Sequence, residues 1–209
     1  MTDSINPTCI LTRDEVLAVL DDLHRRGKKS VSARLNLAIF RLSACCGLRC
    51  KEIAGLLCGD LLLGGSRPVV IVRKENTKGR VDERRARKVP LWWDKGTYDD
   101  LSAWVEEIGA GPKSNVVVSV CGDTFGLPLT RGSIARRWAT AIGVLGHDRV
   151  SQLSIHKGRH TFISHALHTG HGLPSVRDAA GHSSINRTSI YLHAIDSDEI
   201  PDMFSRGDK

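Results

Sequence analysis

Four consecutive β-branched residues, from Val69 to Val72, stand in a chain whose other apolar residues mostly recur at helical spacing. Such a run predicts a β-strand, because branched side chains pack well on a pleated surface. Residues 88–91 predict the partner strand. Pro90 puts that strand at an edge of the sheet, because proline has no N–H to donate to a neighbour. The pair restricts the sheet to a β-hairpin or a three-stranded meander set among helices.

Helical patterns cover most of the remaining chain. Thr12 and Glu15 have the spacing of a capping box, and the apolar residues that follow predict a helix to about Arg26. Further helices are expected at about residues 32–46, 52–58, 98–108, 133–145, 159–168, 173–180 and 185–193. Residues 109–112 and 146–151 predict loops. The predicted fold class is therefore α+β and mainly α, a single domain with a small antiparallel sheet.

The composition indicates a globular intracellular protein. The chain has 209 residues, of which 41% are hydrophobic, enough for one sizeable core. No apolar run is long enough to span a membrane, and the first residues lack a signal peptide. The six cysteines include no Cys-x-x-Cys pair, which favours reduced core thiols over disulfides or a zinc site. We expect a cytoplasmic protein without metal, cofactor or membrane partner.

The positive charge is concentrated in one segment. The net charge is +7, and residues 67–88 hold nine basic and three acidic residues, a local net charge of +6. A basic patch of this kind predicts a polyanionic partner, with nucleic acid as the default. The alternative is a solvated basic hairpin with no partner. Within the segment, Arg73, Lys74 and Arg80 are the expected DNA contacts.

The last quarter of the chain carries side chains suited to phosphoryl transfer. A motif from His156 to His160 contains Arg159, and Gly181-His182 and then Tyr191 follow it. Arginine binds phosphate oxygens in a fork, imidazoles move protons, and a phenol can act as a nucleophile. Each residue alone has an ordinary interpretation, such as a solvated surface charge or a buried tyrosine with one hydrogen bond.

Taken together, these motifs and one earlier in the chain resemble the conserved sequence boxes of the tyrosine recombinase (phage integrase) family. The first box is Cys46-Gly47-Leu48-Arg49 with Lys51-Glu52-Ile53-Ala54, and Lys78 lies in a predicted hairpin turn. The resemblance covers about residues 11–194 and is sharpest from Ile155 to Ala194. The chain departs from the family at Lys157-Gly158, where Asp-Leu is usual, and at Ala180, where Leu is usual. We expect Lys157 to add charge near DNA and Gly158 to loosen the start of its helix.

The resemblance implies a mechanism. Tyr191 attacks a DNA phosphodiester to leave a 3′-phosphotyrosyl bond and a free 5′-hydroxyl, without metal or ATP. Arg49 and Arg159 clamp the non-bridging oxygens. Lys78 protonates the departing 5′-oxygen, and His156 accepts the tyrosine proton. The sixth residue of the implied set, which hydrogen-bonds the phosphate, is His182.

The family also sets expectations for domains and partners. Its members usually carry a helical core-binding domain, whereas about ten residues precede the first predicted helix here. We therefore expect that domain to be absent, with a catalytic domain over about 11–194 and a tail over 195–209. Double-stranded DNA is the implied partner, so the resemblance also implies association with the nucleoid. A synaptic tetramer is expected to assemble on the DNA through the tail. Two alternatives stay open: a catalytically silent DNA-binding regulator derived from a truncated integrase, and a type IB topoisomerase.

Overall fold

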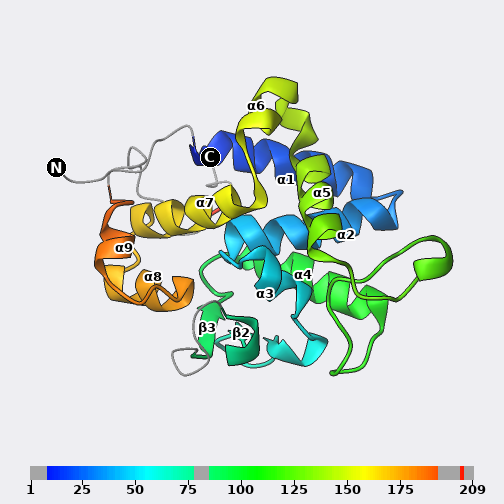
Figure 1. Ribbon diagram of the computed structural model, residues 1–209, viewed down its shortest axis with the longest axis horizontal. Helices are drawn as coiled ribbons and strands as arrows, with labels where there is room; N and C mark the ends of the chain where they lie inside the picture. Colours follow the sequence, from blue (N-terminus) through cyan, green and yellow to red (C-terminus); the bar gives the residue numbers. More distant parts are fainter. Residues whose placement is uncertain (1–8, 78–84, 193–202, 205–209) are drawn as a thin grey trace.

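The fold is mainly helical with one small antiparallel sheet, as the sequence predicts (Figure 1). The computed structural model describes residues 9–77, 85–192 and 203–204. The α-helices are α1 (Arg13–Gly27), α2 (Val31–Phe40), α3 (Cys50–Ala54), α4 (Lys95–Ile108), α5 (Arg131–Ala141), α6 (His147–Gln152), α7 (Ile155–His168), α8 (Leu173–Ala180) and α9 (Asn186–Ser189). A π-helix, η2 (Arg41–Cys45), continues α2, and short 3₁₀ turns are η3 (Cys58–Asp60), η4 (Lys74–Asn76), η6 (Gly122–Thr124) and η7 (Ile142–Leu145).

The predicted capping box starts α1. The Glu15 amide donates to the Thr12 hydroxyl at 3.2 Å, and the Thr12 amide donates to the Glu15 carboxylate at 2.8 Å. Two of the four amides that a helix start leaves unpaired are thereby satisfied. The helix runs to Gly27, one residue beyond the predicted end, and packs along α2 (Figure 1).

The sheet is a three-stranded antiparallel meander. Its strands are β1 (Leu61–Leu62), β2 (Val69–Val72) and β3 (Arg87–Pro90), in that order, with Val70 opposite Val89. The predicted pair of strands is confirmed, and Pro90 lies on the edge strand β3 as expected. The third strand precedes the pair in the sequence. Residues 78–84, which include the predicted Lys78 and Arg80, lie outside the described residues.

The predicted helix over 32–46 is divided, because its second half is a π-helix. The Cys46 amide donates to the Arg41 carbonyl at 2.9 Å, which is the wider π spacing. The buried Arg41 guanidinium forms ion pairs with Asp94 at 3.0 Å and Asp100 at 2.7 Å, which anchor this segment to α4. The chain then turns at Gly47, where φ is +65° and a Cβ atom would lie 2.4 Å from the Phe162 ring.

Other predicted boundaries were wrong in identifiable ways. The predicted loop at 146–151 is helix α6, held by Arg149 through ion pairs with Glu15 and a 2.7 Å hydrogen bond to the Ile10 carbonyl. These long-range contacts outweigh the local loop preference of Gly146. Helix α7 starts four residues earlier than predicted, while α3 and α9 end early, which leaves Tyr191 in a turn after α9.

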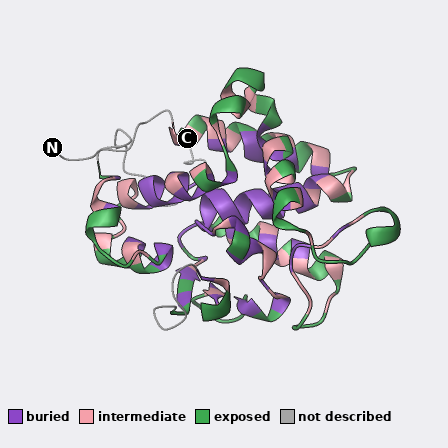
Figure 2. Cartoon of the chain, viewed as in Figure 1, coloured by how far each residue is buried: buried purple, intermediate pink, exposed green. Residues whose placement is uncertain are grey.

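One continuous apolar core joins α1, α2, η2 and α7 (Figure 2). Phe40, Leu48, Trp138 and Phe162 are among its largest fully buried side chains. Four of the six free thiols fill the core as predicted, while Cys9 is half-buried and Cys121 is exposed. None of the helices in the described residues is long and apolar enough to cross a membrane.

A short piece of the predicted tail packs against the body of the same chain. Met203 and Phe204 are buried. The Met203 carbonyl accepts a hydrogen bond from Arg13 at 2.8 Å, and the Phe204 ring lies 5.1 Å from the His165 ring. This part of the tail therefore contacts α1 and α7 in cis.

Gly158 fits a close approach between α7 and η2, which the sequence alone did not indicate. A Cβ atom there would lie 2.8 Å from the Ser43 hydroxyl oxygen and 3.2 Å from its carbonyl carbon. Alanine favours a helix by about 1 kcal/mol over glycine. Because the added methyl group has no room, we still expect Gly158→Ala to lower the free energy of unfolding by about 1–3 kcal/mol in urea titrations.

Gly143→Ala is the matched control, because a Cβ atom at Gly143 would meet nothing within 4 Å. It should change stability by less than about 1 kcal/mol. If the Gly158 variant proved as stable as the wild type, the contact between α7 and η2 would not be tight.

Candidate active site

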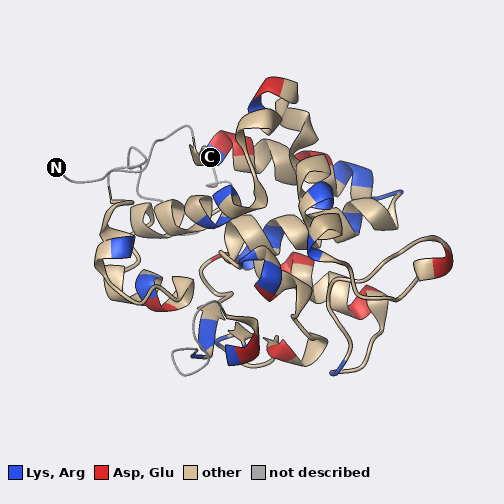
Figure 3. Cartoon of the chain, in the orientation of Figure 1, with Lys and Arg blue, Asp and Glu red and all other residues tan. Residues whose placement is uncertain are grey.

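Five segments far apart in the sequence bring charged and nucleophilic side chains together. Arg49 caps α3, Arg87 lies on β3, and Arg159 and His160 belong to α7. The end of α8 and the turn after α9 complete the group. Figure 3 shows Lys and Arg on α3, β3, α7 and α8, the elements that surround this region.

A buried carboxylate organises two of the arginines. Glu52 is fully buried, and both of its oxygens accept hydrogen bonds from the Arg87 guanidinium at 2.8 Å. It also accepts from the Arg49 amide at 2.7 Å and from the Arg49 guanidinium at 2.9 Å. Burial alone would raise the pKa of Glu52, but the bonds and charges of Arg87 and Arg49 lower it to about 2. The carboxylate is therefore ionised at neutral pH.

Arg159 is buried and links two backbone segments. Its guanidinium donates to the Gly47 carbonyl at 2.9 Å and to the Ala180 carbonyl. Burial, followed by the charges of Arg49 and Arg87, lowers the pKa of Arg159 to about 9. It stays protonated at neutral pH. The result is a cluster of guanidiniums with more positive than negative charge, which suits an anion.

The chain bends sharply after α8 and positions His182. Gly181 has φ +65°, and a Cβ atom there would lie 2.7 Å from Cδ of Arg87. Arg87 also donates through Nε to the Ala179 carbonyl at 2.8 Å. The His182 ring contacts the Thr188 hydroxyl at 3.0 Å. Burial, then the nearby arginine charges, lowers the pKa of His182 to about 3, so the ring is neutral at physiological pH.

The hydroxyl of Tyr191 lies inside this group. Tyr191 is only 3% exposed, and its hydroxyl oxygen is 2.5 Å from Nδ1 of His160. Burial raises the pKa of Tyr191 to about 12, although the charges of Arg159 and Arg49 act in the opposite direction. Its ring centroid lies 6.4 Å from that of His182.

The structure brings Arg49, Arg159, His182 and Tyr191 together, as the resemblance implies. His156 is on the exposed side of the first turn of α7, and the Tyr191 hydroxyl forms its hydrogen bond with His160. Of the expected DNA contacts, Lys74 is exposed and Lys157 is half-buried. Arg73 bonds to Asp60 at 3.0 Å and to the Gly55 carbonyl at 2.8 Å.

Sequence reasoning missed three members of the group: Glu52, Arg87 and His160. Glu52 follows Arg49 at the spacing of a helix cap, which was a usable signal. His160 stood inside the motif but had no assigned role. Arg87 had no distinguishing signal, because it is one of nine basic residues in the charged segment.

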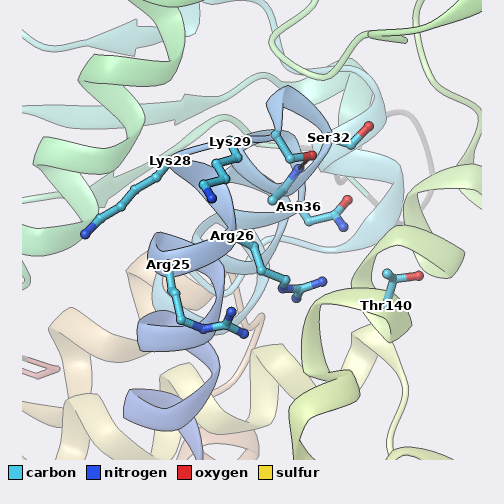
Figure 4. Close-up of a pocket in the computed structure, with 9 residues that line it drawn as sticks. Arg25, Arg26, Lys28, Lys29, Ser32, Asn36 and Thr140 are labelled. Carbon is cyan, nitrogen blue, oxygen red and sulfur yellow. Dashed lines mark hydrogen bonds between the residues drawn. The ribbon is translucent and has the colours of Figure 1, made fainter.

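A second basic surface lies away from this site. A hollow of about 600 Å³ lies where α1 meets α2 and is lined partly by Arg25, Arg26, Lys28 and Lys29 (Figure 4). In Figure 1 the junction of α1 and α2 is at the end of the long axis opposite α8 and α9. Across the described residues, no group of three His, Cys, Asp or Glu side chains is arranged to hold a metal ion.

Comparison with known proteins shows which family the chain belongs to. A sequence model of the phage integrase family matches residues 10–198. The chain belongs to this family. It is 31% identical over 162 residues to the tyrosine recombinase XerC of Corynebacterium efficiens, covering 77% of this chain and 46% of that protein. It is 29% identical over 155 residues to a tyrosine recombinase of Pseudothermotoga lettingae, covering 74% of this chain and 48% of that protein.

The chain spans about half the length of the curated relatives it matches. Among solved structures, XerA recombinase aligns with a TM-score of 0.66 at 20% identity, covering 90% of this chain and 59% of that one. XerH site-specific recombinase bound to the palindromic difH substrate, in a post-cleavage complex, aligns with a TM-score of 0.64 at 21% identity. That alignment covers 92% of this chain and 50% of XerH. Both alignments show that this phage integrase family member shares their fold.

Glu52→Gln should expose the role of the buried charge. Because the pKa of Glu52 is lowered from 4.5 to about 2, its ionised form stabilises the fold fully above pH 4.5, and that contribution is lost as pH falls toward 2. The wild type should be more stable than the variant by about 3 kcal/mol or more at neutral pH. Urea unfolding should show the difference narrowing below pH 4.5.

Glu106→Gln on the exposed face of α4 is the control, and should stay within about 0.5 kcal/mol of the wild type. A Glu52 variant whose deficit did not change with pH would mean that the ionised carboxylate is not the stabilising form.

Proposed function

We propose that this chain supplies the catalytic domain of a site-specific DNA recombinase or integrase. It breaks and rejoins double-stranded DNA through a 3′-phosphotyrosyl intermediate. The supporting observation is the buried Tyr191 hydroxyl, which lies within the field of Arg159 and Arg49. A phenol is a latent nucleophile, and guanidiniums are the groups that bind phosphate best.

In this proposal the arginines stabilise the charge that develops on phosphorus. Arg49 and Arg159 clamp the two non-bridging oxygens, and His182 donates to the phosphate from the neighbouring turn. Ion pairs and carbonyl contacts hold both guanidiniums before substrate arrives, so little reorganisation is needed during reaction. The broken bond's energy is retained in the phosphotyrosine, so the proposed reaction needs no ATP. The guanidiniums supply the positive charge that a divalent metal ion would otherwise provide.

Two proton transfers complete the proposed reaction. Lys78, which lies outside the described residues, is the proposed acid for the departing 5′-oxygen. For the tyrosine proton the resemblance names His156, which lies one helical turn before Arg159 on α7. The proposed DNA contacts remain Arg73, Lys74, Arg80 and Lys157. Of these, Arg73 also forms an ion pair with Asp60.

DNA as the partner is supported by the charge of the site and by the XerH relative, which is bound to its difH substrate. A DNA substrate would place the protein at the nucleoid in the cytoplasm. We propose further that protomers pair on DNA as a synaptic tetramer. The tail is the candidate link, because the side chains that Met203 and Phe204 contact, Arg13 and His165, are present in every copy of the chain and a neighbour could offer them in the same way.

Tyr191→Phe should abolish covalent attachment to a nicked suicide DNA substrate on a denaturing gel, because it removes only the nucleophilic oxygen. Tyr98→Phe, which changes the other tyrosine of the chain, should retain the adduct. DNA binding should be similar for both variants. An adduct in the Tyr191 variant would identify another nucleophile. No adduct in the wild type would favour the silent regulator, and plasmid relaxation without two-site products would favour a topoisomerase.

Deleting residues 195–209 should spare binding to a single DNA site but impair complexes of two paired sites, as seen by gel shift. Met203→Ala combined with Phe204→Ala is the matched variant, because it keeps the length of the tail and removes its two buried anchors. It should show the same loss of paired complexes. Full synaptic complexes from the truncated chain would exclude the tail as the link.

A further inference from the structure

The nucleophile contacts a histidine to which the resemblance gives no role. The Tyr191 hydroxyl oxygen is 2.5 Å from Nδ1 of His160, and the two rings stack with centroids 5.6 Å apart. His156, the residue named for the proton, is exposed on the first turn of α7. A proton acceptor must lie within hydrogen-bonding reach of the proton it takes. In this structure His160 meets that requirement.

We propose that His160 is the catalytic residue that orients the Tyr191 hydroxyl and takes its proton during DNA cleavage. This assignment rests on the proposed function and specifies one step of it. Nδ1 accepts the hydrogen bond, so the neutral ring carries its proton on Nε2. The acceptor is on α7 directly after Arg159, so one helix supplies both a phosphate ligand and the base.

The surroundings keep this histidine neutral and able to accept. Burial, and then the charges of Lys157, Arg159 and His156, lower the pKa of His160 to about 4. The phenol, with a pKa of about 12, therefore keeps its proton in the resting protein. The charged or titratable groups that act on the pair from the elements around it are Lys157, Arg159 and His156 on α7, Arg49 at α3 and His182 after α8.

Proton transfer must therefore accompany bond formation. As the Tyr191 oxygen bonds to phosphorus it becomes far more acidic, and its proton passes to Nδ1 of His160. The P–O5′ bond breaks at the same time, and the 5′-oxygen takes a proton from the general acid, for which Lys78 is proposed. One oxygen–phosphorus bond, to Tyr191, forms as another, to the 5′-oxygen, breaks. The proton held by His160 is then available for the reverse step, in which the DNA strand is resealed.

The test is single-turnover cleavage of a nicked suicide substrate as a function of pH, comparing the wild type with His160→Ala. We expect the variant to be about 10²-fold slower at neutral pH. Without a base, the tyrosine must lose its proton to hydroxide. The ratio of wild-type to variant rate should therefore fall about tenfold for each unit of rising pH. A purely structural defect would leave that ratio constant.

Two asparagine variants sharpen the test. His160→Asn keeps an acceptor oxygen near the position of Nδ1 but cannot take a proton, so its rate ratio should fall with pH like that of the alanine variant. His156→Asn should lower the rate by a factor that does not change with pH. Thermal unfolding identifies any variant that fails to fold. If His160→Ala does not fold, the test uses the pH dependence of His160→Asn instead.

The outcomes separate the two proposals. A wild-type protein that forms no Tyr191 adduct contradicts the proposed function itself. A normal adduct with a constant rate ratio for the His160 variants, or a falling ratio for His156→Asn alone, overturns the assignment of His160 and leaves the recombinase proposal standing. Restoration of the wild-type rate by His160→Asn would reduce His160 to a residue that only orients the phenol.

Discussion

The site depends on one buried ion-pair system, the Glu52 carboxylate between Arg49 and Arg87. Without this counterion the two guanidiniums would repel each other, and the buried charge of Arg87 would be uncompensated, which costs several kcal/mol. Glu52 offsets part of that charge and leaves the cluster with a net positive charge. It also ties the start of α3 to the sheet, so that the position of Arg49 depends on β3.

The arginines also determine the shape of the backbone around them. Arg159 binds carbonyls at Gly47 and Ala180, and Arg87 binds the one at Ala179. Arg159, a candidate phosphate ligand, thus joins the turn after η2 to the end of α8, and Arg87 also binds the end of α8. Gly47 and Gly181 provide the left-handed conformations that let the chain come this close. Replacing Arg159 would therefore remove charge and loosen both turns at once.

Local patterns in the sequence predicted what local interactions determine. The Thr12–Glu15 cap, the Val69–Val72 strand and α8 were predicted correctly, because each depends on neighbours in the sequence. The π-helix and α6 were not, since long-range pairs of Arg41 and Arg149 hold them. The resemblance identified the motif residues from short stretches of sequence. It could not identify His160 as the partner of Tyr191, because that contact depends on how α7 and the turn after α9 pack together.

Three groups of the site have pKa values shifted in the direction expected where positive charge is gathered to bind an anion. Burial and positive neighbours lower the pKa values of His160, His182 and Arg159 together. A phosphate bound between Arg49 and Arg159 would cancel part of that positive field. The pKa of His160 would then rise, and the ring would become a better base only once substrate is present. Substrate binding and activation of the nucleophile would thus be coupled by the same charges.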